Sequence, residues 1–115
     1  MRYLLMIYGD EAGQAAMSPE EGAQMMAAYD KFGDEYGAKG VLRGGERLRP
    51  TSDATTVQVR GGELTTSDGP YAETKEQIGG FYLIESDNLD EAVAVAAAIP
   101  AAHFGTIEVR PIWEM

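Results

Sequence analysis

The sequence predicts an α+β domain with the ferredoxin-like order β-α-β-β-α-β and a β-hairpin inserted into it. Stretches with strand and helix patterns follow one another as strand, helix, strand, hairpin, strand, helix and strand along the 115 residues. Two of these strands, Arg2–Tyr8 and Ile78–Glu85, are apolar at consecutive positions, so both of their faces carry apolar side chains. We therefore expect an antiparallel sheet with two helices on one face and a second cover on the other.

The first strand is predicted at Arg2–Tyr8. Its apolar side chains fall on both faces, Tyr3, Leu5 and Ile7 on one and Leu4, Met6 and Tyr8 on the other. A strand that faces water on one side normally alternates apolar with polar residues. The uninterrupted apolar run therefore indicates a strand that is covered on both sides.

The first helix is predicted to begin after Ser18. Ser18 can cap the helix, Pro19 suits its first position, and Glu21 completes a capping box. Apolar residues then recur at helical spacing, at Met25, Tyr29, Phe32 and Tyr36. The segment Gly37–Gly40 is expected to end the helix.

Glycines mark special backbone positions in the next part of the chain. Gly22 and Gly33 lie inside the predicted helix and are expected to let it pack closely against the sheet. Gly44-Gly45 indicates a bulge or a close backbone contact, and Gly61-Gly62 indicates a two-residue hairpin turn. The strands predicted around these pairs are Val41–Leu48, Thr55–Arg60 and Glu63–Thr66.

The last third of the chain is expected to form a strand at Ile78–Glu85, a helix, and a final strand at Thr106–Trp113. Asn88 can cap the helix, and Glu91 follows three residues later as its capping-box partner. The helix residues expected to face inward are Leu89, Val93, Ala96 and Ile99. The last strand is expected to carry on one face Ile107, Val109 and Trp113.

Both predicted helices belong to one face of the sheet, so the second apolar face needs another cover. In so short a chain the simplest cover is the same sheet of a second copy. We therefore expect a single domain, residues 1–115, that forms a homodimer with its sheets packed face to face.

The composition is that of a globular domain with 44% apolar residues, 24% charged residues and a formal net charge of −10. Such a surface repels a phosphate backbone, so nucleic acid is not expected as a partner. No stretch approaches the length of a membrane span, so a membrane partner is not expected either. The chain has no cysteine, which excludes disulfides and cysteine nucleophiles. We expect a cytoplasmic protein.

No cofactor or metal is expected. One His and no Cys leave only carboxylates as metal ligands, and neither a calcium-loop spacing nor a nucleotide fingerprint is present. Four of the nine basic residues nevertheless fall within eighteen positions, namely Arg43, Arg47, Arg49 and Arg60. They predict a local positive patch in a negative field.

The segment Asp68–Ile84 carries a long motif, DGPYAETKEQIGGFYLI. It resembles the signature of the YCII-related (DGPF-type) family, with Tyr71 where that name implies Phe. The ends of the chain, Arg2–Tyr8 and Glu108–Ile112, also resemble that family. The resemblance implies a dimeric α/β-barrel with a ferredoxin-like subunit, in agreement with the strand pattern.

The resemblance does not imply one activity. Some relatives in the YCII branch have been proposed to be enzymes that use a paired His and Asp, with the His near the first helix. The corresponding stretch here, Ser18–Gln24, has no His, and the only His of the chain is His103. Members of the DGPF branch are often linked to extracytoplasmic sigma factors by gene neighbourhood, which implies a signalling partner.

Asp68 and His103 are the candidate catalytic residues. Asp68 stands at a turn beside the sheet, where a buried carboxylate can act as a general acid or base. The alternative is that Asp68 hydrogen-bonds its own turn before Gly69. His103 suits proton transfer at neutral pH, or is a surface residue of its loop.

Five further residues are candidate substrate-binding groups, Arg43, Tyr71, Glu73, Lys75 and Arg110. The two arginines can bind a substrate carboxylate, or each can form a salt bridge, for Arg43 with Glu46 or Asp68. Lys75 can anchor an anionic group with Glu73 orienting it, or both can lie in a solvated loop. Tyr71 either closes the loop by packing or donates a proton.

Three functions remain open at this point. The first is an enzyme that acts by acid/base chemistry on a small anionic organic molecule in a cleft between sheet and helices. The second is a non-catalytic module that binds or senses such a molecule. The third is a dimeric interaction partner in a sigma-factor-linked signalling system. The fold alone does not distinguish them, since function belongs to sites.

Overall fold

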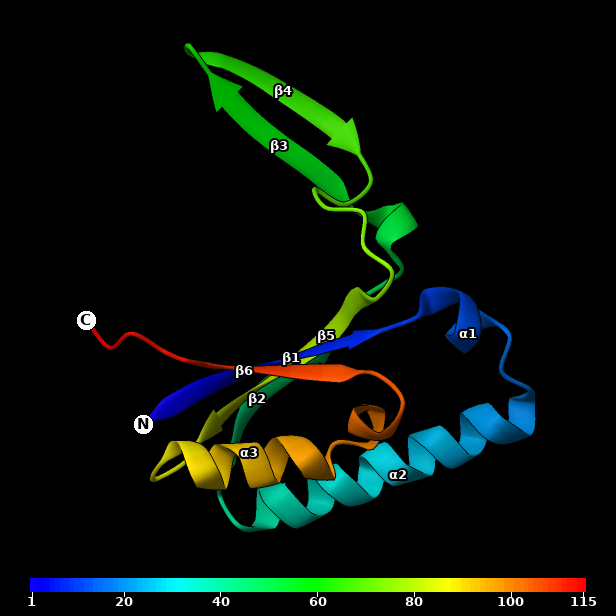
Figure 1. The fold of residues 1–115 in the computed structure, drawn as a ribbon, viewed down its shortest axis with the longest axis vertical. Helices are drawn as coiled ribbons and strands as arrows, with labels where there is room; N and C mark the ends of the chain where they lie inside the picture. Colours follow the sequence, from blue (N-terminus) through cyan, green and yellow to red (C-terminus); the bar gives the residue numbers. More distant parts are fainter.

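A computed structural model describes all 115 residues of the chain. Its body is a four-stranded antiparallel sheet in the order β2-β5-β1-β6 (Figure 1). The strands are β1 (Arg2–Gly9), β2 (Leu42–Arg47), β5 (Gln77–Glu85) and β6 (Thr106–Pro111). With the hairpin left out, this is the ferredoxin-like topology, and the predicted fold class is confirmed.

Two helices, α2 (Pro19–Ala38) and α3 (Leu89–Ala98), lie on the same side of the sheet (Figure 1). The predicted capping box of α2 is present: the Ser18 hydroxyl accepts a hydrogen bond from the Glu21 amide at 3.1 Å, and the Glu21 carboxylate accepts one from the Ser18 amide at 3.1 Å. The helix ends at Ala38, within the glycine-rich segment expected to stop it.

The cap of α3 is confirmed in part. The Asn88 side chain accepts a hydrogen bond from the Glu91 amide at 2.9 Å, as predicted. The Glu91 carboxylate does not close the box on Asn88, and accepts instead from the Asp87 amide at 3.3 Å.

The inward face of α3 differs from the prediction. Ala96 and Ile99 are buried as expected, but Leu89 and Val93 are 52% and 50% exposed. The helix turns Ala92 and Val95 inward instead. Because α3 is apolar on several sides, its packing against the sheet decides which stripe is buried.

Nine side chains form the core between the sheet and the helices: Tyr3, Leu5, Phe32, Ile84, Ala92, Val95, Ala96, Ile99 and Ala101. The α2 stripe reaches this core through Phe32, with Tyr29 and Tyr36 packed beside it. Gly22 and Gly33 do not provide the close approach expected of them, because an added Cβ at either would meet nothing within 4 Å. The helix rests on its aromatic stripe.

The hairpin consists of β3 (Thr55–Arg60) and β4 (Glu63–Asp68), which pair only with each other as a separate two-stranded sheet. Gly61 and Gly62 join them with φ of +58° and +79°, as the predicted two-residue turn requires. The hairpin projects from the body on the side away from the helices (Figure 1).

Three short helices were not predicted: α1 (Glu11–Ala15) and the 3₁₀ helices η1 (Thr51–Asp53) and η2 (Pro100–His103). None is long enough to show a helical period in the sequence. Each lies where the chain leaves or enters a strand: α1 follows β1, η1 follows β2 and η2 precedes β6.

The sheet surface opposite the helices, which we call the helix-free face, is apolar at its centre. Tyr3 and Leu5 point into the core, so alternation turns Leu4 and Met6 to the other side. Leu4 lies directly opposite Leu83 and Met6 directly opposite Phe81 in the β1–β5 ladder. No helix covers this face within the subunit (Figure 1).

The isolated chain exposes much surface for its size. Its accessible surface is 8095 Å² for 12.4 kDa, whereas a compact monomer of this mass exposes about 6,100 Å². Its radius of gyration is 16.1 Å, against about 13 Å for a compact chain of this length. The projecting hairpin and the single layer of helices account for both differences.

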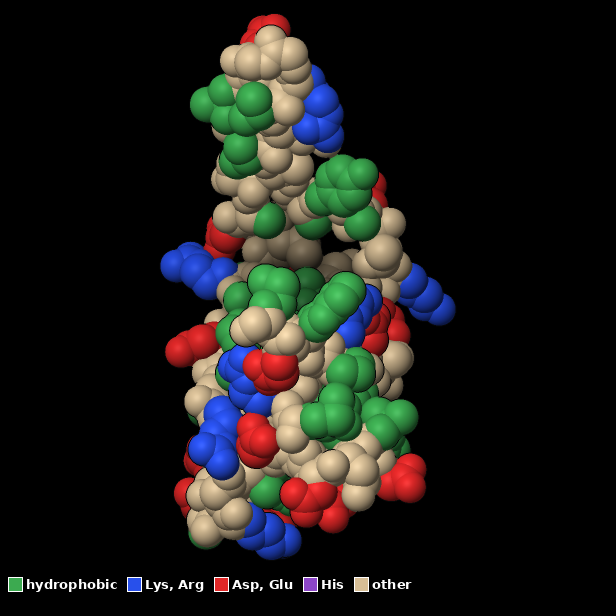
Figure 2. All heavy atoms as spheres, turned by 90° about the vertical axis from the view of Figure 1, so that its left-hand side faces the viewer, with side chains coloured by type: hydrophobic (Ala, Val, Ile, Leu, Met, Phe, Trp, Pro, Cys, Tyr) green, Lys and Arg blue, Asp and Glu red, His purple; other side chains and the backbone are tan.

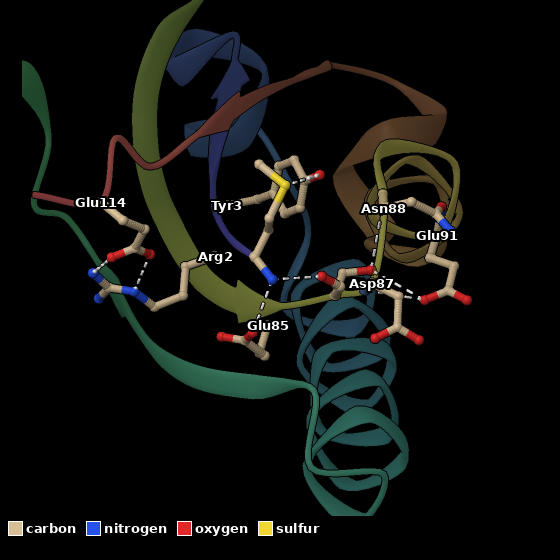
Figure 3. A network of polar contacts seen from close by, with 9 residues as sticks. Arg2, Tyr3, Glu85, Asp87, Asn88, Glu91 and Glu114 are labelled. Atoms are coloured by element: carbon tan, nitrogen blue, oxygen red, sulfur yellow. Dashed lines mark hydrogen bonds and ion pairs between the residues drawn. The ribbon is translucent and has the colours of Figure 1, made fainter.

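Both chain ends are held against the sheet, as Figure 3 shows. The Met1 amine donates to a Glu85 carboxylate oxygen at 2.9 Å, and the Arg2 guanidinium donates twice to the Glu114 carboxylate at 2.8 Å. The last strand ends at Pro111, so Trp113 does not share the face of Val109 as predicted. Trp113 is instead 90% exposed in the C-terminal tail.

Candidate functional site

The predicted site residues are distributed over separate elements of the subunit. Asp68 ends β4, at the base of the hairpin, and is exposed without a hydrogen bond or ion pair of its carboxylate. His103 ends η2 on the opposite side of the sheet from the hairpin. One subunit therefore does not bring the two candidate catalytic residues together.

The candidate binding residues are also apart. Arg43 lies on β2 and Arg110 on β6, which are the two edge strands of the sheet, so three strand spacings of about 4.8 Å separate them. Arg110 pairs with Glu108 of its own strand, while Arg43 forms no ion pair. The loop after β4 leaves its candidate residues exposed, Tyr71 (82%), Glu73 and Lys75.

The arginines expected to form one positive patch are dispersed. Arg60 lies at the far end of the hairpin, and Arg49 pairs with Asp53 at 2.9 Å. Arg47 lies at the end of β2, directly opposite Gly80 of β5. It is the one arginine of the four that lines a substantial cavity.

That cavity is a cleft of about 560 Å³ between α2, one end of the sheet and η2, here called the α2 cleft. Its apolar lining residues are Ile7, Met17, Met25, Met26, Tyr29, Phe81, Tyr82, Ala101 and Phe104; of these, Phe81 is the one whose side chain is turned to the helix-free face by strand alternation. Its remaining lining is Gln14, Gly22, Gly45, Glu46, Arg47, Gly79 and Gly80. Met26 and Phe104 are each 57% exposed, which is unusual for large apolar side chains grouped in one concave surface.

Glycines form one wall of the α2 cleft. Gly45 of β2 lies opposite Tyr82, and a Cβ on it would stand 2.6 Å from Cδ1 of that ring. A Cβ on Gly80 would stand 2.9 Å from the Glu46 carbonyl oxygen. The wall is therefore backbone, and the expected close backbone contact at Gly44-Gly45 is confirmed at Gly45.

Two tyrosines supply hydrogen-bonding groups to the α2 cleft. Burial raises the pKa of Tyr29, although a backbone hydrogen bond with Ala101 and the charge of Arg47 oppose the shift. Burial also raises the pKa of Tyr82, and the neighbouring Tyr29 adds to that increase. Both phenols are therefore protonated at neutral pH and can donate hydrogen bonds to a ligand.

The orientation of Tyr82 is fixed by aromatic packing. The ring of Phe32 lies 5.0 Å from the ring of Tyr82 and 4.9 Å from that of Tyr36. These spacings are typical of tilted aromatic pairs, which hold ring orientation as well as burying area. The buried Phe32 thus links the wall of the cleft to the core.

Glu11 of α1 connects the elements beside the cleft through hydrogen bonds. Its carboxylate accepts hydrogen bonds from the Thr51 amide and the Thr51 hydroxyl, both at 2.8 Å. Its amide donates to the Gln77 side chain at 3.1 Å. One residue thus joins α1 to η1 and to the start of β5, and fixes the segment that carries Gln14 and Met17.

The sequence did not identify this site. Tyr29 was assigned to the core stripe of α2, and Tyr82 to a doubly buried strand. Arg47 was noted only as part of a charge cluster. Two residues point to the cleft. One is Gly45, and the other is Met26, an exposed large apolar side chain that the apolar stripe of α2 does not need for the core.

No group of three or more His, Asp or Glu side chains is arranged to hold a metal ion. None of the helices combines the length and the apolar character that a bilayer-spanning helix needs.

Comparison with known proteins places the chain in a family. A family model described as the YCII-related domain matches residues 1–115. An uncharacterised protein of Rhizobium meliloti (strain 1021), R00369, is 40% identical over 114 residues, which cover 97% of this chain and 92% of that protein. The chain thus belongs to the YCII-related domain family, as its DGPYAETKEQIGG motif and its ferredoxin-like fold already indicated.

Proposed function

We propose that this protein binds a small organic molecule in the α2 cleft and does so as a homodimer. The observation that carries the proposal is a cleft of about 560 Å³ whose side chains are mostly apolar and whose few polar groups lie together. Small-molecule sites in proteins have volumes of about 300–1,000 Å³ and the same combination of apolar walls and a few oriented polar groups.

The polar groups of the cleft favour a ligand with an anionic or carbonyl oxygen. Tyr29 and Tyr82 remain protonated and donate hydrogen bonds, and Arg47 supplies a positive charge beside Tyr29. In a chain with a net charge of −10, the positive charge of Arg47 makes the cleft a local point of attraction for an anion. We expect a small acid with an apolar body.

An acid/base enzyme acting on the same ligand is the second candidate. His103 lies in the chain between Ala101 and Phe104, which both line the cleft, although His103 itself is not part of the lining. Asp68, Tyr71, Glu73, Lys75, Arg43 and Arg110 do not line the cleft of their own subunit. Their catalytic or binding roles therefore need a neighbouring subunit.

The homodimer is supported by the helix-free face. Its centre is formed by Leu4, Met6, Phe81 and Leu83, and no element of the subunit covers it. The excess of accessible surface over a compact monomer is about 2,000 Å², more than one partner contributes to a typical stable interface. A second copy packed on this face would bury the apolar centre of both sheets.

Ligand binding is tested by titrating small aromatic and aliphatic carboxylic acids, with their amides and the matching amines, in a thermal-shift assay. We expect a subset of the acids to raise the melting temperature. Arg47→Gln should weaken that binding by at least about tenfold, as expected for loss of a charged hydrogen bond. Arg60→Gln is the matched control, because Arg60 lies at the tip of the hairpin, and it should bind as the wild type does.

Two results would contradict the proposal. One is a panel in which no acid stabilises the protein. The other is equal affinity of Arg47→Gln and the wild type, which would place the ligand elsewhere.

A further inference from the structure

The β3–β4 hairpin has no partner within its own subunit. Its two strands form a separate two-stranded sheet, and neither pairs with any strand of the main sheet. Its base is held by hydrogen bonds from the Gly69 amide to the Ala54 carbonyl and from the Thr56 hydroxyl to the Gly69 carbonyl, both at 2.8 Å. An isolated two-stranded hairpin is marginally stable in water, so this one needs a surface to pack against.

One face of the hairpin is apolar and exposed. Val57 and Val59 alternate onto the same face of β3, and Leu64 lies directly opposite Val59. The three side chains are 58%, 57% and 64% exposed. Figure 2 shows hydrophobic side chains gathered on one flank of the hairpin and again on the body below it, with a recess between.

We propose that this hairpin is an arm that grips a second copy of the chain, with Val57, Val59 and Leu64 packed on the partner. The arm extends from the body on the helix-free side (Figure 1). Its six-residue strands are about 20 Å long, whereas sheets that pack face to face lie about 10 Å apart. An arm of this length passes the edge of the partner's sheet and lies against its side.

The exposed area of the subunit supports this occupant. Its accessible surface exceeds that of a compact monomer by about 2,000 Å², whereas each partner of a stable interface buries about 800 Å². The projecting arm accounts for part of that excess and carries three exposed apolar side chains. In a two-fold dimer each subunit both extends an arm and receives one, so the arm surface would be buried twice.

Charge also favours a second copy. Between Asp53 and Arg60, and again between Glu63 and Asp68, the arm has no charged residue, in a chain where 24% of residues are charged. Two chains of net charge −10 repel each other. Contact through this uncharged segment adds the least electrostatic repulsion between the subunits.

The inference rests on the homodimer part of the proposed function and is independent of the cleft ligand. Its test compares two double variants that add the same charge to neighbouring cross-strand pairs. Val59→Lys/Leu64→Lys changes the apolar face, and Gln58→Lys/Thr65→Lys changes the opposite face. Far-UV circular dichroism checks that each variant is folded, and sedimentation equilibrium gives its dimer dissociation constant.

We expect Val59→Lys/Leu64→Lys to weaken the dimer by about 100-fold or more, as loss of central apolar contacts does, and Gln58→Lys/Thr65→Lys to change it by less than about threefold. Amide hydrogen exchange in β3 and β4 should slow as the wild type dimerises. A dimer unaffected by either variant would overturn the inference, and so would equal weakening by both variants. A monomeric wild type would overturn both the homodimer and the arm, while the acid-binding assay would still report on the cleft.

Discussion

Gly45 lies directly opposite Tyr82 in the β2–β5 ladder, so close that a Cβ on Gly45 would stand 2.6 Å from the tyrosine ring. The same Cβ would stand 2.8 Å from the carbonyl oxygen of Phe81, which cannot move without disturbing β5. The shape of the α2 cleft therefore depends on the absence of a side chain at one position of an edge strand.

Gly45→Ala should lower the free energy of unfolding by about 1–3 kcal/mol, the usual cost of overpacking, and should weaken acid binding because Tyr82 is displaced. Chemical denaturation measures the first effect and the thermal-shift titration the second. Gly79→Ala is the control, since its Cβ meets nothing within 4 Å, and its stability should stay within about 0.5 kcal/mol of the wild type. Equal stability of the two variants would show that Tyr82 is not held as described.

The phenols of Tyr29 and Tyr82 in the cleft should lose their protons at a higher pH than an ordinary tyrosine does. Burial raises the pKa of Tyr29 and of Tyr82 above the ordinary value of about 10. The folded state then holds their protons at a pH where the unfolded state releases them. The stability that they contribute is thus complete below about pH 10 and is lost as the pH rises through the folded-state pKa.

In ultraviolet titrations, Tyr29→Phe and Tyr82→Phe should each remove one late-titrating phenol. Loss of an early-titrating phenol in Tyr29→Phe would contradict the proposed environment of the cleft.

The capping box of α2 should titrate in acid. The hydrogen bonds from the Ser18 amide and hydroxyl lower the pKa of Glu21 below its ordinary value. The stability that Glu21 contributes is therefore present above about pH 4.3 and is lost as the pH falls through the lowered folded-state pKa. Carbon-detected NMR should find the Glu21 midpoint below the ordinary value for a glutamate. Ser18→Ala should raise that midpoint and cost about 1 kcal/mol as a lost cap.

Substitution at the centre of the helix-free face should separate the subunits without unfolding them. Met6 lies opposite Glu108 of β6, so Met6→Lys gains a neighbouring carboxylate in the free subunit but places a charge between two packed sheets. We expect a folded monomer by circular dichroism and sedimentation. Gln24→Lys adds the same charge on the exposed side of α2 and should remain dimeric. A Met6→Lys dimer of wild-type affinity would remove the helix-free face from the interface.

Local rules in the sequence were enough to predict most of the fold. Ser18 and Glu21 marked the start of α2, and Gly61-Gly62 marked the hairpin turn, because caps and turns depend on residues that are adjacent in the chain. The inward face of α3 was predicted less well. Its sequence is apolar on several sides, so only packing against the sheet decides between Val93 and Val95.

The site could not be predicted in the same way. The α2 cleft is assembled from α2, β2, β5 and η2, and no short motif spans these elements. The long motif that identifies the family instead forms β5 and a loop before it, where Asp68, Tyr71 and Lys75 are exposed. Whether those residues act at a partner's surface stays a prediction. A single sequence does not show which residues of two subunits face each other.

The most direct test is the mass of the wild-type chain in dilute solution, measured by light scattering coupled to size exclusion at micromolar concentration. A sheet covered by a second copy predicts twice the 12.4 kDa of the chain. A mass of 12.4 kDa under these conditions would leave the apolar helix-free face in water and would contradict the homodimer, and with it the arm.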